Sequence, residues 1–417
     1  MLNIEILTTG DELLEGLITD TNSAHIAREV TPFGVTVRRV TTVGDTLEEL
    51  RDALLEISAR ADVCVITGGL GPTSDDLTLD ALALAAGVPL EVDEGLWGEI
   101  QAFYRGRGRV PPSNRSQARV PRGGTPLRSE VGTAPGMRIT LNGCEFFAYP
   151  GVPSELYWHC EQTLLPYLAA RLSVTLHRQT LRLCLLGESR LYDLIKPLEL
   201  PGDVRVGYQA LGVEVRLKLS SPSRASLDRA VHLISTTVEA DAPGHLVSLN
   251  DRSLAEALTA LLTAQGLTLA TAESCTGGAV SAAIAAVPGA SAALLGGVVA
   301  YSNEVKRQQL GVSEETLTAH GAVSEACALE MARGARAALG SHWAIAITGI
   351  AGPGGGTPEK PVGTVCFAWA GPSGASAERR YIKGDRQRVQ SVSTHEALFG
   401  LWRRLSERAP ALEVTDV

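Results

Sequence analysis

The sequence predicts an α/β protein: two α/β domains with mainly parallel sheets covered by helices, joined by a small α+β connector. Apolar runs of strand length alternate with amphipathic helical patterns in the first and last parts of the chain, which is the order that β-α-β units produce. The 417 residues are 45% hydrophobic and 20% charged. A chain of this length and composition can form several domains, each with its own core.

The first domain is expected at residues 1–172. Alternating apolar residues predict a strand over residues 2–7, and an uninterrupted apolar run predicts a buried parallel strand at residues 63–66. Between them, apolar residues three or four positions apart predict a helix over residues 47–59. Parallel sheets of this kind bind ligands at the carboxyl ends of their strands.

The connector is expected at residues 173–249 and the last domain at residues 250–417. Ser324 and Gly340 are a suitable start and end for one helix of the last domain. The connector has strand patterns at residues 180–186 and 213–219 and a helix pattern at 226–238. The last domain has strand patterns at residues 267–272, 294–300, 343–348 and 362–370 and helix patterns at 324–339 and 385–405.

Charge and cysteine content exclude several classes of protein. The chain has 37 basic and 46 acidic residues, a net charge of −9, whereas a DNA coat or a polybasic membrane binder needs a cationic face. The seven cysteines form no C-x-x-C pair, so neither a zinc site nor a disulfide framework is indicated. The first residues do not resemble a signal peptide, and we expect a cytoplasmic protein.

One long segment, residues 274–303, carries no charge and is long enough to span a bilayer. Pro288 and Gly289 interrupt it, and Ala, Gly and Ser make up most of it. This composition favours a buried helix, a turn and a strand over a membrane helix.

In the first domain, glycines and carboxylates follow two predicted strands. Glycines let phosphate oxygens approach backbone N–H groups, and carboxylates beside phosphate require a divalent cation. Alternatively, the two aspartates at residues 75 and 76 cap the next helix and the glycines form turns. The candidate metal ligands are Asp11, Glu12, Asp75 and Asp76, and the candidate substrate contacts here are Gly69, Gly71, Thr73 and Asn114.

In the last domain, a predicted strand leads into Ser274, Cys275 and Thr276 and then into two glycines. A hydroxyl at a strand-to-helix turn is well placed to be a nucleophile, and the N–H groups of Gly277 and Gly278 could stabilise an oxyanion. Ser274 is the candidate nucleophile and Cys275 the rival. Alternatively, Ser274 only caps the helix.

The next strand is followed by Tyr301, Asn303 and Lys306. If Asn303 caps a helix, Lys306 lies in its first turn, where the helix dipole disfavours an ammonium ion and so favours a neutral base. A Ser–Lys pair is therefore more plausible than a Ser–His–Asp triad. A third strand end and the last helix add a phosphate cradle, with candidate contacts at Thr348, Gly349, Gly352, Gly354, Gly355 and Arg386. Alternatively, Arg386 forms an exposed salt bridge. Further candidate substrate contacts are Thr276, Gly277, Gly278 and Asn303.

Together these motifs resemble the CinA family. They are T-G-D-E-L-L-E-G at residues 9–16, D-T-N at 20–22, T-G-G-L-G-P-T-S-D-D-L-T at 67–78, G-T-A-P-G at 132–136, P-G-V-P-S-E at 150–155, A-E-S-C-T-G-G at 272–278, Y-S-N-E-V-K at 301–306 and T-G-I-A-G-P-G-G-G-T-P-E-K-P-V-G-T-V at 348–365. The sequence departs from the family pattern at Ser129, where an Asn is expected, and residues 173–249 contain no G-x-x-G loop.

The resemblance implies a bifunctional enzyme of pyridine-nucleotide recycling that works as a homodimer. A molybdopterin-binding-like domain would hydrolyse ADP-ribose to AMP and ribose 5-phosphate with a divalent metal ion. After a KH-like connector, the last domain would deamidate nicotinamide mononucleotide (NMN) without a cofactor, using Ser274, Tyr301 and Lys306 as catalytic residues. Neither a membrane nor direct nucleic-acid binding is expected. The alternative is a non-enzymatic, competence-associated module that binds DNA-processing proteins.

Overall fold

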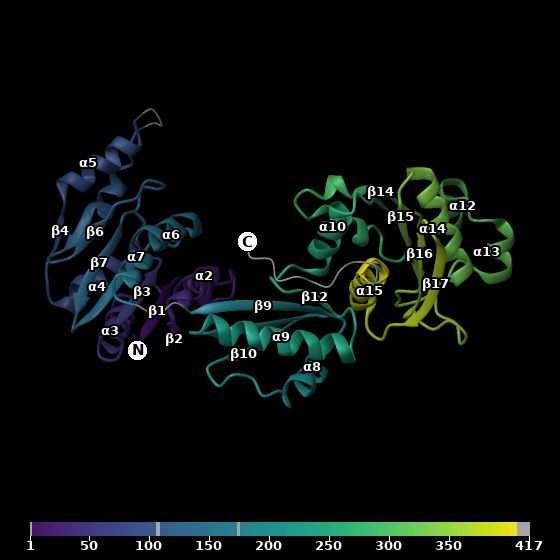
Figure 1. Cartoon of the computed structure of the whole chain (residues 1–417). Helices are drawn as coiled ribbons and strands as arrows, with labels where there is room; N and C mark the ends of the chain where they lie inside the picture. The colour runs from purple at the N-terminus through teal and green to yellow at the C-terminus, as the bar shows by residue number, and fades with distance from the viewer. Residues whose placement is uncertain (1, 106–108, 173–175, 407–417) are drawn as a thin grey trace. The chain divides into compact units, whose positions relative to one another are not determined.

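The computed structural model describes residues 2–105, 109–172 and 176–406 (Figure 1). The chain divides into two compact units, Met1–His177 and Arg178–Val417. Both units contain helices packed on sheets, which confirms the predicted α/β class. The expected first boundary adjoins residues 173–175, which lie outside the described residues.

The first unit is built on a six-stranded mixed sheet with the order β2-β1-β3-β8-β7-β6. Strand β1 pairs in parallel with β2 and β3, and β3 pairs in parallel with β8, whereas β7 is antiparallel to both β8 and β6. The six strands are β1 Ile4–Thr9, β2 Val37–Val43, β3 Val63–Thr67, β6 Thr125–Leu127, β7 Gly136–Leu141 and β8 Cys144–Tyr149.

Helices cover both faces of this sheet. Leu7 and Ile66 pack with the buried residues of α3 and α4, whereas Ile4, Val65 and Phe147 pack with those of α2, α6 and α7. Strands β1 and β3 are buried along their whole length because both faces of the sheet are covered there. The α-helices are α1 Asp11–Leu14, α2 Thr21–Val30, α3 Leu47–Ser58, α4 Thr78–Ala86, α5 Glu94–Phe103, α6 Pro153–His159 and α7 Leu165–Ala169. The unit also has the 3₁₀ helices η1 Thr31–Phe33 and η2 Pro112–Ala118, the π-helical segment η3 Cys160–Leu164, and a small sheet of β4 Leu90–Val92 and β5 Arg119–Pro121.

The second unit begins with the connector, a four-stranded sheet with two helices on one side (Figure 1). Its elements follow the order β-α-β-β-α-β, which is that of the ferredoxin-like arrangement. We therefore describe the connector as ferredoxin-like rather than KH-like. The elements are β9 His177–Cys184, α8 Glu188–Ile195, β10 Arg205–Leu211, β11 Glu214–Ser221, α9 Arg224–Asp241 and β12 Leu246–Ser248.

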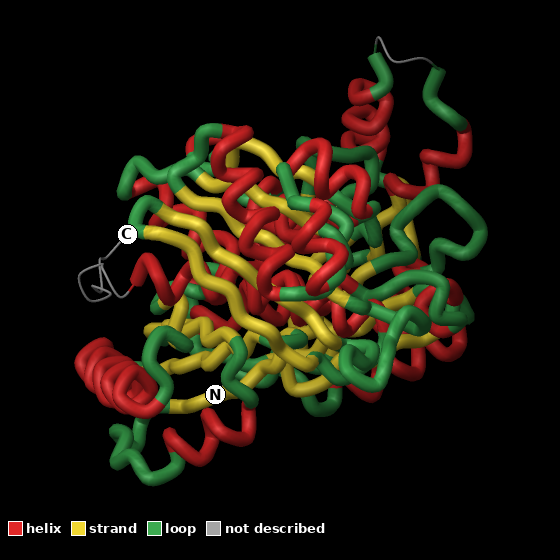
Figure 2. Tube along the Cα trace, turned by 90° about the vertical axis from the view of Figure 1, so that its right-hand side faces the viewer, coloured by secondary structure: helices red, strands yellow, loops and turns green. Residues whose placement is uncertain are grey.

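A five-stranded sheet with the order β14-β13-β15-β16-β17 forms the rest of the second unit, with helices packed against its twisted strands (Figure 2). Strand β13 pairs in parallel with β14 and β15, and the last three strands are antiparallel. The elements are α10 Leu254–Ala264, β13 Leu269–Glu273, α11 Ala279–Ala285, η4 Ala290–Ala292, β14 Leu294–Val299, α12 Asn303–Leu310, α13 Glu314–His320, α14 Glu325–Leu339, β15 Trp343–Gly349, β16 Thr364–Gly371, β17 Gly374–Tyr381 and α15 Arg386–Ser406.

In both large sheets the strands are thus parallel on one side, out to the edge strands β2 and β14, and antiparallel on the other side. The expectation of mainly parallel strands describes the part of each sheet that carries the predicted motifs. At the edge of the second sheet, β16 and β17 pair up to Gly371 and Gly374. A connection of two residues can join only antiparallel strands.

Side-chain size separates the two faces of the second sheet. In β15, Ile345 and Ile347 pack with α10, α11 and α15, whereas Ala344 and Ala346 pack with α12 and α14. Successive strand residues point to opposite faces of the sheet. The alternation of large and small residues therefore places the alanines on one face, and α14 packs on this flat surface. As predicted, Ser324 caps α14 and Gly340 ends it in the left-handed conformation.

The connector shares a core with the last sheet, so the expected boundary at residue 250 does not separate compact units. Val247 of the connector packs in the same cluster as Leu254 and Phe399. The indole N–H of Trp402 donates to the carbonyl oxygen of Gly244 at 3.0 Å. Sequence patterns within each segment carry no information about such contacts between segments.

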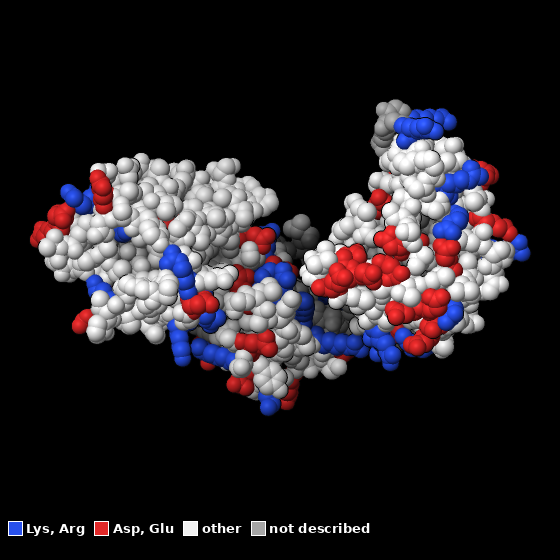
Figure 3. Space-filling model, turned by 180° about the vertical axis from the view of Figure 1, so that it is seen from behind, with Lys and Arg blue, Asp and Glu red and all other residues white. Residues whose placement is uncertain are grey.

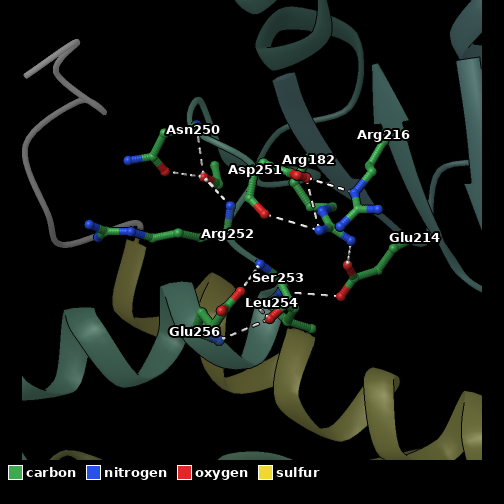
Figure 4. A network of polar contacts seen from close by, with 10 residues as sticks. Arg182, Glu214, Arg216, Asn250, Asp251, Arg252, Ser253, Leu254 and Glu256 are labelled. Carbon is green, nitrogen blue, oxygen red and sulfur yellow. Dashed lines mark hydrogen bonds and ion pairs between the residues drawn. The ribbon is translucent and has the colours of Figure 1, made fainter. Parts of the chain in front are cut away.

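Buried charges reinforce this junction (Figure 4). The Arg182 guanidinium contacts the Glu214 carboxylate at 3.0 Å, and both side chains are buried. Glu214 also accepts the backbone N–H of Leu254, at the start of α10, and Arg182 donates to the backbone oxygen of Asp251. The first turn of α10 is therefore attached to the connector sheet.

Among the described helices, none combines the length and apolar character that a membrane span requires. The uncharged segment at residues 274–303 forms α11, η4 and β14, as its composition predicted. All seven cysteines are free and buried.

Candidate functional site

The turn after β13 is organised by one buried carboxylate. Glu273 accepts hydrogen bonds from the Thr276 hydroxyl, from the Ser281 hydroxyl and from the backbone N–H groups of Gly278, Val280 and Ser281, at 2.8–3.1 Å. A carboxylate that accepts several N–H groups at the start of a helix is strongly held. Glu273 therefore fixes the turn that carries Ser274 and the start of α11.

Ser274 and Lys306 come together as the sequence predicted. The Lys306 Nζ lies 3.0 Å from the Ser274 Oγ. Ser274 is 8% exposed and Lys306 only 1% exposed. The two residues come from the carboxyl ends of neighbouring parallel strands, since Ser274 follows β13 and Lys306 lies in the helix that follows β14.

The surroundings of Lys306 suit a neutral amine. Its Nζ donates to the backbone oxygens of Ala300 and Tyr301 at 2.8 and 3.2 Å. A neutral amine has two N–H bonds and one lone pair, so with both N–H bonds engaged the lone pair can face Ser274. Burial lowers the pKa of Lys306 from its usual value, because the charged form is disfavoured away from water. Lys306 can therefore accept a proton from Ser274.

The start of α12 differs from the expected one in two details. Ser302, not Asn303, caps α12, and its hydroxyl accepts the N–H of Val305. Asn303 is the first helical residue and is exposed. Lys306 is thus one position further from the cap than expected, although it still belongs to the start of the helix.

Tyr301 contacts Lys306 through its backbone, not through its ring. The side chain is 59% exposed, and its hydroxyl accepts a hydrogen bond from Arg386 at 2.8 Å. Arg386 also donates to the carbonyl oxygen of Gly352 at 2.9 Å. The resemblance implies that Tyr301 is catalytic, but in this arrangement its hydroxyl bonds Arg386 and only its backbone oxygen bonds Lys306. Instead, Arg386 joins the predicted phosphate cradle to Tyr301.

The expected oxyanion donors are already engaged. Gly277 donates its N–H to the backbone oxygen of Ser274, and Gly278 donates to Glu273. By contrast, the N–H of Thr276 has no acceptor among the residues that the structure describes. Gln390 of α15 holds the carbonyl oxygen of Cys275 at 2.8 Å. The C=O and N–H of a trans peptide point in opposite directions, so Gln390 directs the Thr276 N–H away from α15.

Cys275 is a poor rival for Ser274. Burial raises the pKa of its thiol to about 12, and only the thiolate is a strong nucleophile. A Cβ atom on Gly349 would lie 3.1 Å from the Cys275 sulfur, so the glycine gives this thiol its space. Cys275 therefore packs beneath the turn.

The remaining predicted contacts of this region lie at the end of β15 and along the loop that follows it. The Thr348 hydroxyl is buried and donates to the carbonyl oxygen of Ala322, so it supports the loop before α14. Gly354 and Gly355 are exposed. Gly352 precedes a cis proline, and its oxygen is held by Arg386.

A second candidate site lies in the first unit. A cavity of about 500 Å³ opens at the carboxyl ends of β1, β3 and β8. Its lining includes Gly69, Gly71, Glu12, Asp75 and Asp76. Gly69 has a φ of +64°, and a Cβ there would lie 2.3 Å from the Thr78 hydroxyl. Only glycine fits this turn.

The four predicted metal ligands divide into two pairs. Asp76 accepts the N–H groups of Gly71 and Thr73 and the Thr73 hydroxyl, and Asp11 accepts the N–H of Asp45. These carboxylates shape loops. Glu12 and Asp75 are exposed and line the cavity. Among the described residues, no group of three His, Cys, Asp or Glu side chains is arranged to hold a metal.

Two side chains of the quoted motifs were not among the predicted site residues. Asn22 and Glu155 line the cavity, and the oxygens Asn22 Oδ1 and Glu155 Oε2 are buried with no hydrogen-bond partner among the described residues. Burial raises the pKa of the Glu155 carboxyl. Their places in D-T-N and P-G-V-P-S-E were the available signal.

Asn114 does not line this cavity. Its amide donates to Gln117 at 2.9 Å, and Gln117, which does line the cavity, donates to the carbonyl oxygen of Leu70 at 3.2 Å. Asn114 therefore supports the glycine-rich loop from behind.

Fold and sites define a class: a two-unit α/β protein with a carboxylate-rich cavity in one unit and a buried serine–lysine pair in the other. Residues 5–170 match the family described as probable molybdopterin binding domain, and residues 251–405 match the CinA C-terminal domain. A CinA-like protein of Anaeromyxobacter sp. (strain Fw109-5) is 42% identical over 95% of this chain and 98% of its own length. Another, of Parasynechococcus marenigrum (strain WH8102), is 44% identical over 96% and 98%. The chain belongs to the CinA family.

A solved structure of a CinA superfamily protein from Klebsiella pneumoniae 700603 is 42% identical to this chain. The matched region spans 37% of this chain and 96% of the Klebsiella chain, with a TM-score of 0.36.

Replacing Glu273 by Gln should destabilise the second unit by about 2 kcal/mol or more, because an amide offers one acceptor oxygen to donors that now share two. Urea unfolding would measure the change. Glu304→Gln is the matched control: Glu304 is exposed on α12 and accepts one hydrogen bond, so its loss should stay within about 0.5 kcal/mol. Equal stabilities for the two variants would contradict the role given to Glu273.

Proposed function

We propose that the second unit is an amidase that converts NMN to nicotinate mononucleotide and ammonia. The observation that carries the proposal is the buried Lys306 amine, 3.0 Å from the Ser274 hydroxyl, with two backbone carbonyls on its N–H bonds. The resemblance of the surrounding motifs to nicotinamide-nucleotide amidases indicates the substrate. Arg386, beside the glycine-rich loop, is the group that would bind the nucleotide phosphate.

The reaction begins with the Ser274 oxygen attacking the amide carbonyl carbon while its proton passes to Lys306. The Thr276 N–H, which has no acceptor among the described residues, stabilises the oxyanion in place of Gly277 and Gly278. Lys306 then returns the proton to the amide nitrogen, and the C–N bond breaks with release of ammonia. Water, deprotonated by Lys306, hydrolyses the acyl-enzyme and releases the acid.

We further propose that the first unit hydrolyses ADP-ribose to AMP and ribose 5-phosphate with a divalent ion. Such ions are held by one or two carboxylates together with substrate phosphates. The exposed Glu12 and Asp75 fit this requirement, as do the Asn22 and Glu155 oxygens that have no hydrogen-bond partner among the described residues. When bound, the ion would neutralise the pyrophosphate charge. The glycine-rich loops would hold phosphate oxygens through their N–H groups.

The same proposal includes a homodimer in the cytoplasm that acts on small molecules and binds neither a membrane nor nucleic acid directly. Free, buried cysteines support a reducing compartment. Incubating the protein with NMN and with ADP-ribose, and assaying for ammonia and AMP, tests both activities. Silence in both assays would favour the module that binds DNA-processing proteins.

Ser274→Ala, Lys306→Ala and the double variant should each lose amidase activity by several powers of ten, and the losses should not add because the two groups act as one unit. ADP-ribose hydrolysis should persist in all three. Initial rates of ammonia release measure the effect. Cys275→Ala is the control and should keep most of the activity. A dead but folded Cys275→Ala variant would contradict the Ser–Lys mechanism.

The amidase should lose activity as the pH falls. Lys306 must be neutral to accept the Ser274 proton, and burial lowers its pKa, so kcat/KM should rise with pH and level off at a pH below the usual pKa of lysine. The pH profile of kcat/KM checks this. Replacing Lys306 by a side chain of different pKa, in a variant that retains measurable activity, should shift the pH at which kcat/KM rises. If that pH does not shift, the rise belongs to another residue.

EDTA should abolish ADP-ribose hydrolysis and leave the amidase largely intact, because the Ser–Lys mechanism needs no ion. Asp75→Asn should weaken activation by added Mg²⁺ or Mn²⁺ at least tenfold. Asp52→Asn, a change at an exposed position of α3, is the matched control. Equal loss of both activities on chelation would refute the separation of the two sites.

A further inference from the structure

Strand β14 is an edge strand of unusual composition. It ends the order β14-β13-β15-β16-β17 and lies within the uncharged segment at residues 274–303. Edge strands expose unpaired N–H and C=O groups, and natural proteins protect them with charges, proline or very short length. Strand β14 has six residues and contains neither charge nor proline.

The other edges of the three larger sheets carry such protection. Arg38 and Arg39 lie in β2, Arg205 begins β10, and Glu378 to Arg380 lie in β17. Strands β6 and β12 have three residues each, and β6 contains a proline. Within the described residues, β14 is thus the exception. A register irregularity beside Leu295 is confined to its beginning.

The backbone of β14 indicates which groups are unpaired. Ala300 donates its N–H to the Glu273 carbonyl of the neighbouring strand β13, so alternate residues before it also face β13. The residues between them, Gly297 and Val299, direct their N–H and C=O groups to the open edge.

Apolar side chains gather along the same edge. Leu295, Val299 and Tyr301 are 46%, 49% and 59% exposed. They are three of the four large hydrophobic side chains that are exposed among the described residues after residue 250, the fourth being Tyr381. Seen from behind, the upper part of this region is a broad uncharged surface (Figure 3).

We propose that β14 pairs antiparallel with β14 of a second copy of this chain, joining two five-stranded sheets into one of ten strands. A two-fold axis at Val298 places Gly297 opposite Val299 of the second copy, so that both open backbone pairs are satisfied. It also places Leu295 opposite Tyr301 of the second copy. A symmetric interface brings identical surfaces together, and an uncharged surface can meet itself without repulsion in a chain of net charge −9.

This assigns a surface to the proposed homodimer and does not depend on the amidase chemistry. A stable interface buries about 1,600 Å², more than one short strand supplies. Helix α11, whose exposed residues are small and uncharged, lies beside β14 and would add area. The second copy would also cover the Tyr301 ring, whose hydroxyl holds Arg386, so each copy would complete the substrate side of the other's site.

Sedimentation equilibrium of the full chain tests the surface. The wild type should have twice the mass of one 43.9 kDa chain at micromolar concentration. Leu295→Lys combined with Val299→Lys should raise the dissociation constant at least 100-fold, because four ammonium groups would be placed in the uncharged interface. Tyr381→Lys, on the edge strand β17 and 63% exposed, is the matched control and should stay dimeric. A monomeric wild type, or a double variant as dimeric as the control, would overturn the proposal.

A cysteine pair tests the register. Val298 would face Val298 of the second copy as a non-hydrogen-bonded pair, with Cα atoms about 4.5 Å apart, a separation that a disulfide can bridge. Oxidised Val298→Cys should therefore form a covalent dimer on a non-reducing gel, and Leu295→Cys should not, since it would face Tyr301. The native cysteines are buried, so their background should be low. Cross-linking of Leu295→Cys but not of Val298→Cys would refute this pairing.

Discussion

The carboxylate of Glu273 is the constraint on which the second unit's site depends. It lies at the end of a central strand and accepts hydrogen bonds from the turn and from the first residues of α11. An anion buried in this way is stable only while its donors remain in place, so the carboxylate and the turn hold each other. Ser274 is thereby presented beside Lys306 without needing a cap or a histidine to orient it.

The fold could be predicted wherever one segment's own pattern determines its structure. Helix α14 matches its expected bounds because Ser324 and Gly340 provide its start and end. Strand β17 was missed because its sequence is mostly small or charged, and it is a strand only because β16 offers it a partner. The shared core of connector and last sheet was equally invisible, since Trp402 and Gly244 are joined across 158 positions of sequence.

The site, like the fold, could be predicted only where the pattern of a single segment or the order of the strands determines it. Ser274 and Lys306 follow neighbouring strands, so the topology alone brings them together. Which donor meets which acceptor within the turn depends on the exact backbone conformation, which the sequence pattern does not specify. The N–H groups of Gly277 and Gly278 therefore proved to be engaged. Asn22 and Glu155 were missed because unpartnered oxygens are recognised only once their surroundings are known.

Strand β14 connects the Ser274–Lys306 site with the open edge of the sheet. The two residues directly after β14, Ala300 and Tyr301, supply the carbonyl oxygens that hold the Lys306 amine, and the Ala300 N–H donates to the backbone oxygen of Glu273. The position of the base is therefore set by backbone groups, which vary little with side-chain identity. If the open edge of β14 is paired with a second copy, the strand that holds the lysine gains hydrogen bonds on its other side. Dimerisation would then restrict the motion of the base while leaving its chemistry unchanged.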